Sequence, residues 1–136
     1  MTVALKSRGL RAAGAMLAAM LTLQGVPALS GDRDDCSSDD HEKAIPACTR
    51  LISSRKTPKA DLPTFYYNRA TSYIANSEYD AAITDLDKAI ELKSDYAEAY
   101  VSRGIAYDYK KDFDAALRDY TAVSYTHLTL PTNREV

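Results

Sequence analysis

Apolar and small side chains recur at helical spacing through the middle of the chain. Between Thr64 and Asn76, and again between Tyr79 and Leu92, they return every three or four positions, which places them along one face of a helix. Pro63 fixes a backbone angle that suits the first turn of the first helix. Asn76 begins a short polar turn between the two runs. The pattern therefore predicts two antiparallel helices joined by a turn.

The same pattern returns 34 residues later. The repeated positions are Tyr66, Arg69, Tyr73, Asp80, Ala81, Ala82 and Asp85, which reappear as Tyr100, Arg103, Tyr107, Asp114, Ala115, Ala116 and Asp119. A fixed period of this length predicts a repeat array, in which each unit buries its apolar face by stacking on a neighbour. The second pair of helices is expected over residues 97–110 and from Phe113 to about Thr121, with Asp95 and Glu98 forming a capping box at its start.

A degenerate copy of the pattern precedes the first unit. Residues 42–52 carry a helical stripe of apolar groups and align with residues 80–90, which places Cys48 at the position of Leu86. Asp39 has an acidic residue three positions later, as a capping box requires. Two stretches are expected to be irregular: residues 31–38 and the linker at residues 53–62.

The first thirty residues have the layout of a secretory signal peptide. A basic start is followed by a short apolar run, a break and small residues at both key cleavage positions. In order, these features are Lys6, Arg8 and Arg11, residues 12–23, Gly25 with Pro27, and Ala28 with Ser30. Cleavage after Ser30 would make the protein periplasmic or secreted. The alternative, a membrane anchor, requires roughly 20 apolar residues, more than this run provides.

Two cysteines, Cys36 and Cys48, follow the predicted signal. In an exported chain we expect them to be bonded to each other. Closing the 11-residue loop between them stabilises the fold by roughly 3 kcal/mol in the chain-entropy model. A metal site is not favoured, because His41 is the one nearby additional nitrogen ligand and four ligands are needed.

Charge argues against nucleic acid as a partner. Removal of Lys6, Arg8 and Arg11 leaves 14 basic and 19 acidic residues, a net charge of −5, whereas phosphate binding needs a clustered basic face. After cleavage no membrane partner is expected either. The acidic group at Asp34, Asp35, Asp39 and Asp40 is interpreted as a solvated lead-in to a helix rather than a cation site.

Nothing in the sequence argues for catalysis. His41 is the one histidine before the C-terminal tail, Cys48 occupies a buried helix position in the alignment, and no glycine-rich phosphate loop is present. The scattered acidic residues are more simply solvated helix faces than acid/base pairs. We therefore predict a protein that is not an enzyme and needs no cofactor.

The helical period fails in the last fifteen residues. Of the positions that should be apolar in a helix continuing past Tyr120, Val123 alone is apolar, and the tail is rich in Thr and broken by Pro131. Residues 122–136 resemble a translated sequencing adapter, which predicts that the natural chain continues with further repeats. The alternative is a genuine C-terminal extension.

The repeated positions resemble those of the tetratricopeptide repeat (TPR) family. The residues that match its bulky and small positions are Tyr66, Ala70, Tyr73, Tyr79, Ala82 and Ala89 in residues 63–96, and Tyr100, Gly104, Tyr107, Phe113 and Ala116 in residues 97–121. Residues 31–62 would be a disulfide-tied half repeat with its linker. The resemblance implies an all-α fold of antiparallel helix-turn-helix units stacked as a short right-handed superhelix.

Proteins of this family bind partners along a concave groove lined by the first helix of each unit. Carried over by position, the resemblance implies a groove formed by Thr64, Tyr67, Asn68, Thr71, Ile74, Glu98, Val101, Ser102, Ile105 and Asp108. Tyr67 and Thr71 stand where a clamp for a peptide carboxylate would have Lys and Asn, so such a clamp is not expected. A mixed polar and apolar groove suits an extended or helical peptide.

These observations predict a non-catalytic scaffold for an unidentified protein or peptide. One alternative is the N-terminal repeat portion of a larger envelope enzyme that continues beyond residue 121. Another is a self-associating module, because an uncapped last unit would expose apolar groups at Phe113, Leu117 and Tyr120. Arg69 and Arg103 are expected to pair with Asp85 and Asp119 on the surface, in preference to forming a row that reaches for an acidic ligand.

Overall fold

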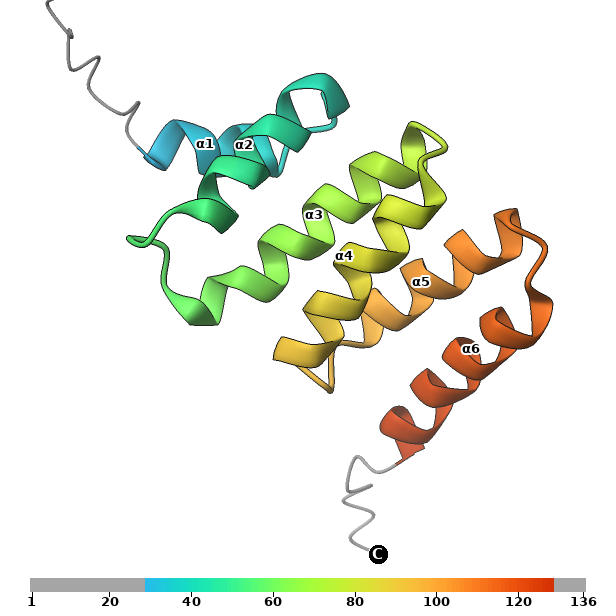
Figure 1. The fold of residues 1–136 in the computed structure, drawn as a ribbon. Coiled ribbons are helices and arrows are strands. Elements are labelled where there is room, and N and C mark those ends of the chain that lie inside the picture. The colour runs from blue at the N-terminus through green and yellow to red at the C-terminus, as the bar shows by residue number, and fades with distance from the viewer. Residues whose placement is uncertain (1–28, 129–136) are drawn as a thin grey trace, which may run out of the picture.

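The computed structural model describes residues 29–128, which fold entirely into helices and the turns between them (Figure 1). The helices are α1 (Leu29–Cys36), α2 (His41–Ser53), α3 (Leu62–Ala75), α4 (Tyr79–Leu92), α5 (Ala97–Tyr109) and α6 (Phe113–Leu128), with a 3-10 turn at Lys59–Asp61. The predicted all-α fold is confirmed. None of the described helices is long and apolar enough to cross a membrane.

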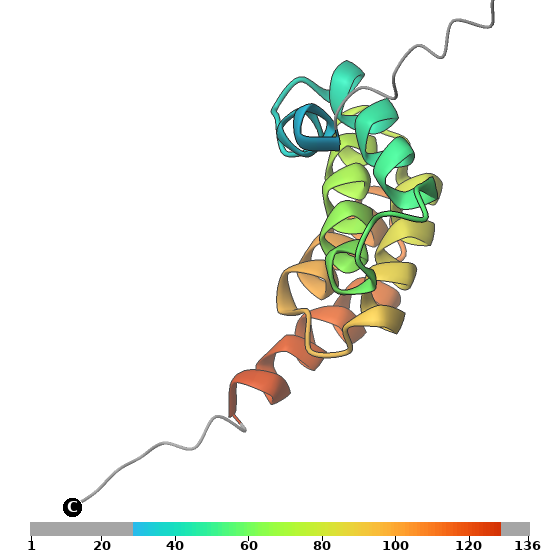
Figure 2. The same ribbon diagram turned by 90° about the vertical axis from the view of Figure 1, so that its left-hand side faces the viewer.

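Consecutive helices pack as pairs, and the pairs stack in chain order. The pairs are α1 with α2, α3 with α4, and α5 with α6, and each second helix also packs on the first helix of the next pair. In addition α3 touches both α1 and α5, whereas α4 touches neither α2 nor α6 within the described part of the chain. The first helices therefore form an inner row along an elongated stack (Figure 2).

The repeat extends to the backbone of the turns. Ser77 and Lys111, 34 positions apart, both have a φ of 64°, a left-handed conformation that commonly ends a helix. The residue after each donates its N–H to a carbonyl five positions back, Glu78 to Tyr73 at 2.8 Å and Asp112 to Tyr107 at 2.9 Å. The two turns thus close their helices in the same way.

Small residues lie where the helices of a pair cross. Ala70 and Ala82 are completely buried, together with Leu86 and Ala89, so the axes of α3 and α4 can approach closely. The tyrosines of the repeat are half-buried around this cluster. In the second pair Gly104 lies against the ring of Tyr120, and a Cβ atom at residue 104 would lie 2.5 Å from the nearest ring carbon.

The prediction that residues 31–38 are irregular was wrong. Helix α1 covers most of this stretch, so residues 29–53 form a complete helix pair rather than half of one. Two bonds to α2 hold α1 in place: the predicted Cys36–Cys48 disulfide, which is confirmed, and a pair between the buried Asp32 and Arg50, with Nη2 at 2.5 Å from Oδ1. Neither bond leaves an apolar stripe in the sequence, which explains why the period did not predict this helix.

Two predicted helix caps were misplaced. The N-cap of α2 is Asp40 rather than Asp39, and its carboxylate accepts a bond from the N–H of Lys43. Tyr96, not Asp95, occupies the N-cap position of α5, and it makes no side-chain cap bond. In contrast, Pro63 stands in the first turn of α3 as predicted.

Helix α6 ends later than predicted. It continues through Leu128, past the expected end near Thr121. The added turns run back along α5, and Ala122 and Val123 are half-buried there. The predicted signal peptide falls almost wholly on residues 1–28, and the end of the unusual tail on residues 129–136, both outside the described residues. Cleavage after Ser30 would remove two residues from the first turn of α1.

Candidate interaction groove

The inner row presents most of the predicted groove residues to solvent. Five are exposed, namely Thr64, Glu98, Val101, Ile105 and Asp108, and four are half-buried, namely Tyr67, Asn68, Thr71 and Ile74. Ser102 is buried, with 8% of its surface accessible. The ten residues do not form one uniform channel, and eight of them line three hollows.

The central hollow lies between α3, α5 and the end of α6, and has a volume of about 430 Å³. It is lined by Tyr67, Ala97, Glu98, Val101, Ser102, Ile105 and Val123. Five of these seven residues were predicted. Val123 was missed because it lies in the stretch assigned to the tail, and it reaches the hollow because α6 continues antiparallel to α5.

Aromatic rings extend the wall of the central hollow. The ring centroids of Tyr67 and Tyr96 are 5.2 Å apart, with the rings tilted by 39°. Burial raises the pKa of Tyr96. The ammonium group of Lys93 lies 4.6 Å from the centroid of the Tyr96 ring, a cation–π contact. This wall is apolar in its body and polar at the hydroxyl tips.

The N-terminal hollow lies on the other side of α3, with a volume of about 190 Å³. It is lined by Cys36, Ser37, Ser38, Asp39, His41, Asn68, Thr71 and Ser72. The hydroxyls of Thr71 and Ser72 donate to the carbonyl of Asn68. Nδ1 of His41 is buried without a hydrogen-bond partner among the described residues. This hollow is polar, and it brings Asn68 and Thr71 together with α1 and the turn before α2.

The C-terminal hollow is lined by Ile105, Asp108, Tyr109 and Phe113, with a volume of about 390 Å³. Ile105 also lines the central hollow, so the two are contiguous. Two predicted residues line none of the three hollows. Thr64 is exposed near the start of α3, and Ile74 packs against the buried cluster between α3, α4 and α5.

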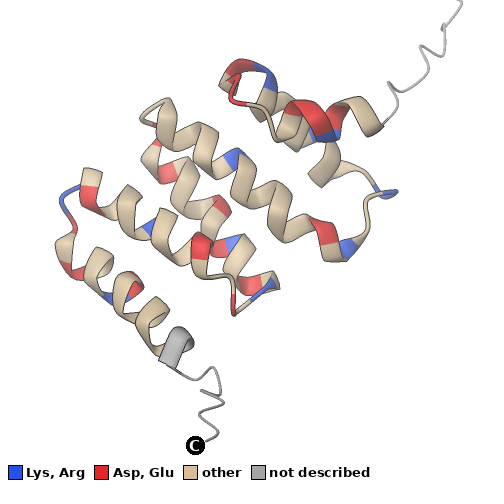
Figure 3. Cartoon of the chain, turned by 180° about the vertical axis from the view of Figure 1, so that it is seen from behind, with Lys and Arg blue, Asp and Glu red and all other residues tan. Residues whose placement is uncertain are grey.

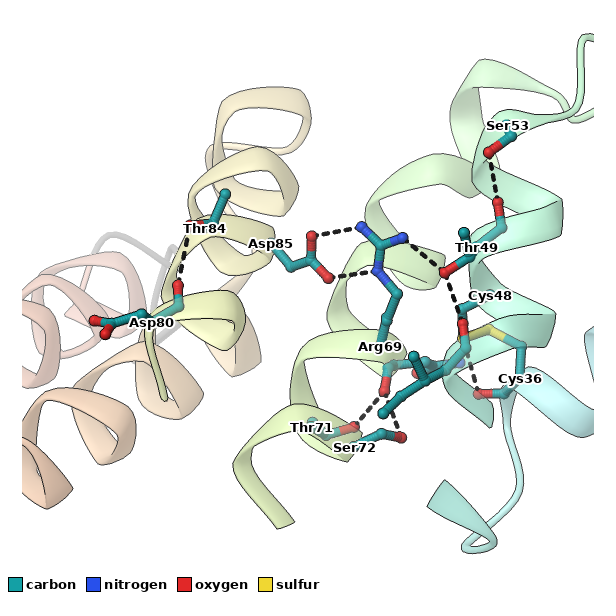
Figure 4. Close-up of polar contacts among 12 residues, drawn as sticks. Cys36, Cys48, Thr49, Ser53, Arg69, Thr71, Ser72, Asp80, Thr84 and Asp85 are labelled. Atoms are coloured by element: carbon teal, nitrogen blue, oxygen red, sulfur yellow. Dashed lines mark hydrogen bonds and ion pairs between the residues drawn. A yellow bond between two sulfur atoms is a disulfide. The ribbon is translucent and has the colours of Figure 1, made fainter. Parts of the chain in front are cut away.

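The two repeated arginines do not face the groove. Arg69 donates from Nε and Nη2 to the two carboxylate oxygens of Asp85, both at 2.7 Å, and from Nη1 to Thr49 at 2.9 Å (Figure 4). Arg103 repeats the arrangement, with Asp119 at 2.8 and 2.6 Å and with Asp87 at 2.5 Å.

Each arginine therefore ties together three helices: its own, the second helix of its own pair and the second helix of the preceding pair. The predicted pairing is confirmed, but the prediction that the pairs are exposed was wrong. The accessible fraction of the side chains is 15% and 7% for Arg69 and Asp85, and 19% and 7% for Arg103 and Asp119. Hydrogen bonding to the carboxylates raises the pKa of both arginines.

Charges are unevenly distributed along the inner row. Helix α3 carries one charged residue, Arg69, whereas α1 carries four and α5 three. Further charges lie on the second helices and in the turns (Figure 3). No group of three or more His, Cys, Asp or Glu within residues 29–128 is placed to hold a metal ion.

Comparison with known proteins identifies the repeat. Residues 70–108 match the sequence model of the TPR repeat. Over 84 residues, 61% of the chain, the sequence is 37% identical to the mitochondrial import receptor subunit TOM70 of Rattus norvegicus, and the match covers 14% of that receptor. A second relative is the human serine/threonine-protein phosphatase 5, 31% identical over 90 residues, which make up 17% of the phosphatase.

A solved structure shares the fold. The first TPR domain of Spaghetti (RPAP3), solved bound to the HSP90 peptide SRMEEVD, superposes with a TM-score of 0.63 at 22% identity. The superposition covers 74% of this chain and 76% of that one. The chain thus spans most of that domain but less than a fifth of the matched receptor and phosphatase.

Proposed function

Because this chain is a TPR-repeat protein, we propose that it is a non-catalytic scaffold that binds a peptide segment of a partner protein along its inner row. The observation that carries the proposal is the contiguous pair of hollows over α5. The side chains of Val101 and Ile105 there are each 38% exposed, although both are apolar residues in the middle of a packed helix. Exposed apolar groups flanked by polar ones are typical of a binding groove.

A peptide selection followed by groove variants tests this proposal. Peptides selected from a random display library on the purified protein should bind less tightly to the Val101→Ser/Ile105→Ser variant. Burying two apolar side chains at an interface contributes about 1–3 kcal/mol in total, so we expect a loss of about 5-fold to 100-fold in affinity. Leu92→Ser is the matched control, because Leu92 is 48% exposed and lines none of the three hollows.

NMR titration of a selected peptide into the isotope-labelled protein locates the binding site independently. The amide signals of α3 and α5 should shift, and those of α2 should not. If no peptide is selected, or if the Ser variants bind as the parent does, the inner row is not the binding surface.

We also propose that the protein is exported, with its signal removed after Ser30. The basic and apolar layout of the first thirty residues supports this, as does the Cys36–Cys48 disulfide, since structural disulfides form in oxidising compartments. Expression of the full chain in a bacterial host, followed by mass determination of the product, should give a species that begins at Gly31. A product of the full encoded mass would contradict export with cleavage.

A second candidate is the repeat portion of a larger enzyme. The match to serine/threonine-protein phosphatase 5, which covers 17% of that enzyme, favours it, because a similar repeat segment there forms part of an enzyme. Reading the genomic locus beyond codon 121 discriminates between the two. Further units of 34 residues favour the scaffold, and a following domain without this period favours the enzyme.

Self-association is a third candidate. Phe113 and Leu117 are 64% and 62% exposed, whereas the equivalent Tyr79 and Ile83 of the first unit are half-buried by the unit that follows. Tyr120, the third residue expected on this surface, does not belong to it. Its ring is half-buried over Gly104, and its hydroxyl donates to Asp108 at 3.3 Å.

A further inference from the structure

We propose that the groove selects a partner segment in which apolar residues are flanked by Lys or Arg. This inference rests on the proposed function and names the chemistry of its partner. It follows from the charges that line the hollows and from the way in which the basic residues of this chain are already bonded.

The Asp, Glu, Lys and Arg residues that line the three hollows are all acidic. Asp39 lines the N-terminal hollow, Glu98 the central one and Asp108 the C-terminal one. No Lys or Arg lines any of them. Within the described residues Asp39 and Glu98 take part in no salt bridge, and Asp108 is bonded to the neutral Tyr120 hydroxyl. All three residues are exposed, so a partner cation can reach them without displacing a bond to a cation of this chain.

The basic side chains near the groove are already committed to bonds. Arg69 and Arg103 are held by buried aspartates, and the ammonium of Lys93 lies over the Tyr96 ring. Further lysines pair with acidic residues that line none of the three hollows: Lys43 with Asp40, Lys88 with Glu91 and Lys110 with Asp80. Of these cations Lys93 alone is not paired with a carboxylate, so an acidic ligand would meet three carboxylates with little compensation, which is unfavourable.

The apolar lining sets the second requirement. Val101 and Ile105 on α5 give apolar surface between Glu98 and Asp108. Tyr109 at the end of α5 and Phe113 on α6, which are 61% and 64% exposed, extend this surface beyond Asp108. Glu98, Val101, Ile105 and Asp108 follow one another at spacings of three, four and three residues on α5, along one face of the helix. A segment bound along this face would thus meet an acidic group, two apolar groups and a second acidic group.

The proposed partner differs in charge from the peptide bound to the RPAP3 domain, which has the same fold. That peptide, SRMEEVD, has three acidic residues among its last four. The acidic lining of the present groove disfavours such a ligand.

Binding of two matched peptides tests the inference. They have equal length and the same leucine positions, and carry Lys in one and Glu in the other at every polar position. Fluorescence anisotropy with the purified, disulfide-bonded protein should show tighter binding of the Lys peptide, weakening as salt is added. An exposed charge pair contributes about 0.2–1 kcal/mol, so Glu98→Gln/Asp108→Asn should lower the affinity for the Lys peptide by about 2-fold to 25-fold.

Glu91→Gln is the matched control, since Glu91 is exposed on α4 and bonded to Lys88, away from the hollows. It should bind the Lys peptide as the parent does. If both peptides bind equally and compete with a library-selected groove peptide, or if Glu91→Gln weakens binding as much as the double variant, the charge preference is overturned while the groove stands. If neither these peptides nor any library peptide binds, the proposed function itself fails, and this inference with it.

Discussion

At the scale of residues, the repeated arginines act as ties between units. Arg69 bonds both Asp85 of its own pair and Thr49 of the preceding pair, and Arg103 bonds Asp119 and Asp87 in the same way. Thr49 and Asp87 occupy equivalent places, each directly following the aligned Cys48 and Leu86. The bidentate geometry is suited to arginine, whose planar guanidinium matches a carboxylate. One repeated residue therefore fixes both the register within a unit and its contact with the unit before.

Removing a buried carboxylate should lower the free energy of unfolding much more than removing an exposed one. In Asp85→Asn the partly buried guanidinium of Arg69 loses its charged partner, and we expect the free energy of unfolding to fall by about 2–3 kcal/mol. Glu91→Gln, which breaks an exposed pair, should lower it by less than about 0.5 kcal/mol. Urea unfolding of both variants measures the difference. Equal losses would mean that the Arg69 ties contribute no more than a surface pair.

Gly104 and Tyr120 form a second residue-level unit. In the first repeat the equivalent pair is Ala70 and Leu86, both completely buried. The large ring of Tyr120 thus accompanies a glycine, where the smaller leucine accompanies an alanine. A Cβ atom at residue 104 would lie 2.5 to 3.0 Å from three ring carbons of Tyr120, closer than packed atoms approach.

We therefore expect Gly104→Ala to destabilise the protein although alanine favours helix. Overpacking costs about 1–3 kcal/mol, and the helix propensity of alanine offsets up to about 1 kcal/mol. Adding Tyr120→Leu should recover most of the loss, because the pair then matches the first repeat. A double-mutant cycle by urea unfolding measures the coupling. Additive effects of the two substitutions would show that the ring does not restrict residue 104.

At the scale of elements, a helix could be predicted from the sequence when apolar packing stabilises it, and not when other bonds do. Helices α3, α4 and α5 are held by apolar packing, and their bounds were predicted to within a residue or two from period and turn residues. Helix α1 is held by a disulfide and by the Asp32–Arg50 pair, which leave no periodic signal. Helix α6 was predicted too short, because its last turns expose Ser124 and Tyr125 and bury little.

The groove was predictable to the same extent. Of the ten groove residues predicted from position in the repeat, eight line a hollow on the inner row. That position could not show that Asn68 and Thr71 face a different hollow from Tyr67, because that division depends on α1 and on the turn before α2. Position in the repeat also could not predict that Val123 lines a hollow, because this depends on where α6 ends.

Loss of the disulfide should loosen one end of the stack alone. In the Cys36→Ser/Cys48→Ser variant α1 keeps the Asp32–Arg50 pair but loses its covalent tie, at a cost of roughly 3 kcal/mol. Because units of a repeat array couple chiefly to their neighbours, amide hydrogen exchange should accelerate in α1 and α2. The amides of α5 and α6 should exchange as in the parent. Uniform acceleration through all six helices would show that the chain unfolds as one cooperative unit.

At the scale of the whole molecule, the described stack ends in an exposed apolar surface on α6. Where the first unit meets the second, the rings of Tyr79 and Tyr109 stack with centroids 5.0 Å apart and planes 8° apart. Phe113, the equivalent of Tyr79, has no following unit within the described residues and is 64% exposed, and Leu117 beside it on α6 is 62% exposed. Exposed apolar groups whose equivalents in the first unit are half-buried by a neighbouring unit indicate a surface suited to another helix.

This exposed apolar surface should make the protein self-associate. With no further unit attached, two copies should cover their exposed ends with each other, so the mass by sedimentation should rise with protein concentration. Phe113→Gln/Leu117→Gln should remain monomeric over the same range, because the substitution removes the apolar groups without touching the core. The control is Val101→Gln/Ile105→Gln, which removes two other exposed apolar groups, those of the groove, and should associate as the parent does. If the parent stays monomeric, the prediction of self-association is wrong and the surface is better suited to packing against a following repeat. If the control loses association, the contact between copies lies in the groove instead.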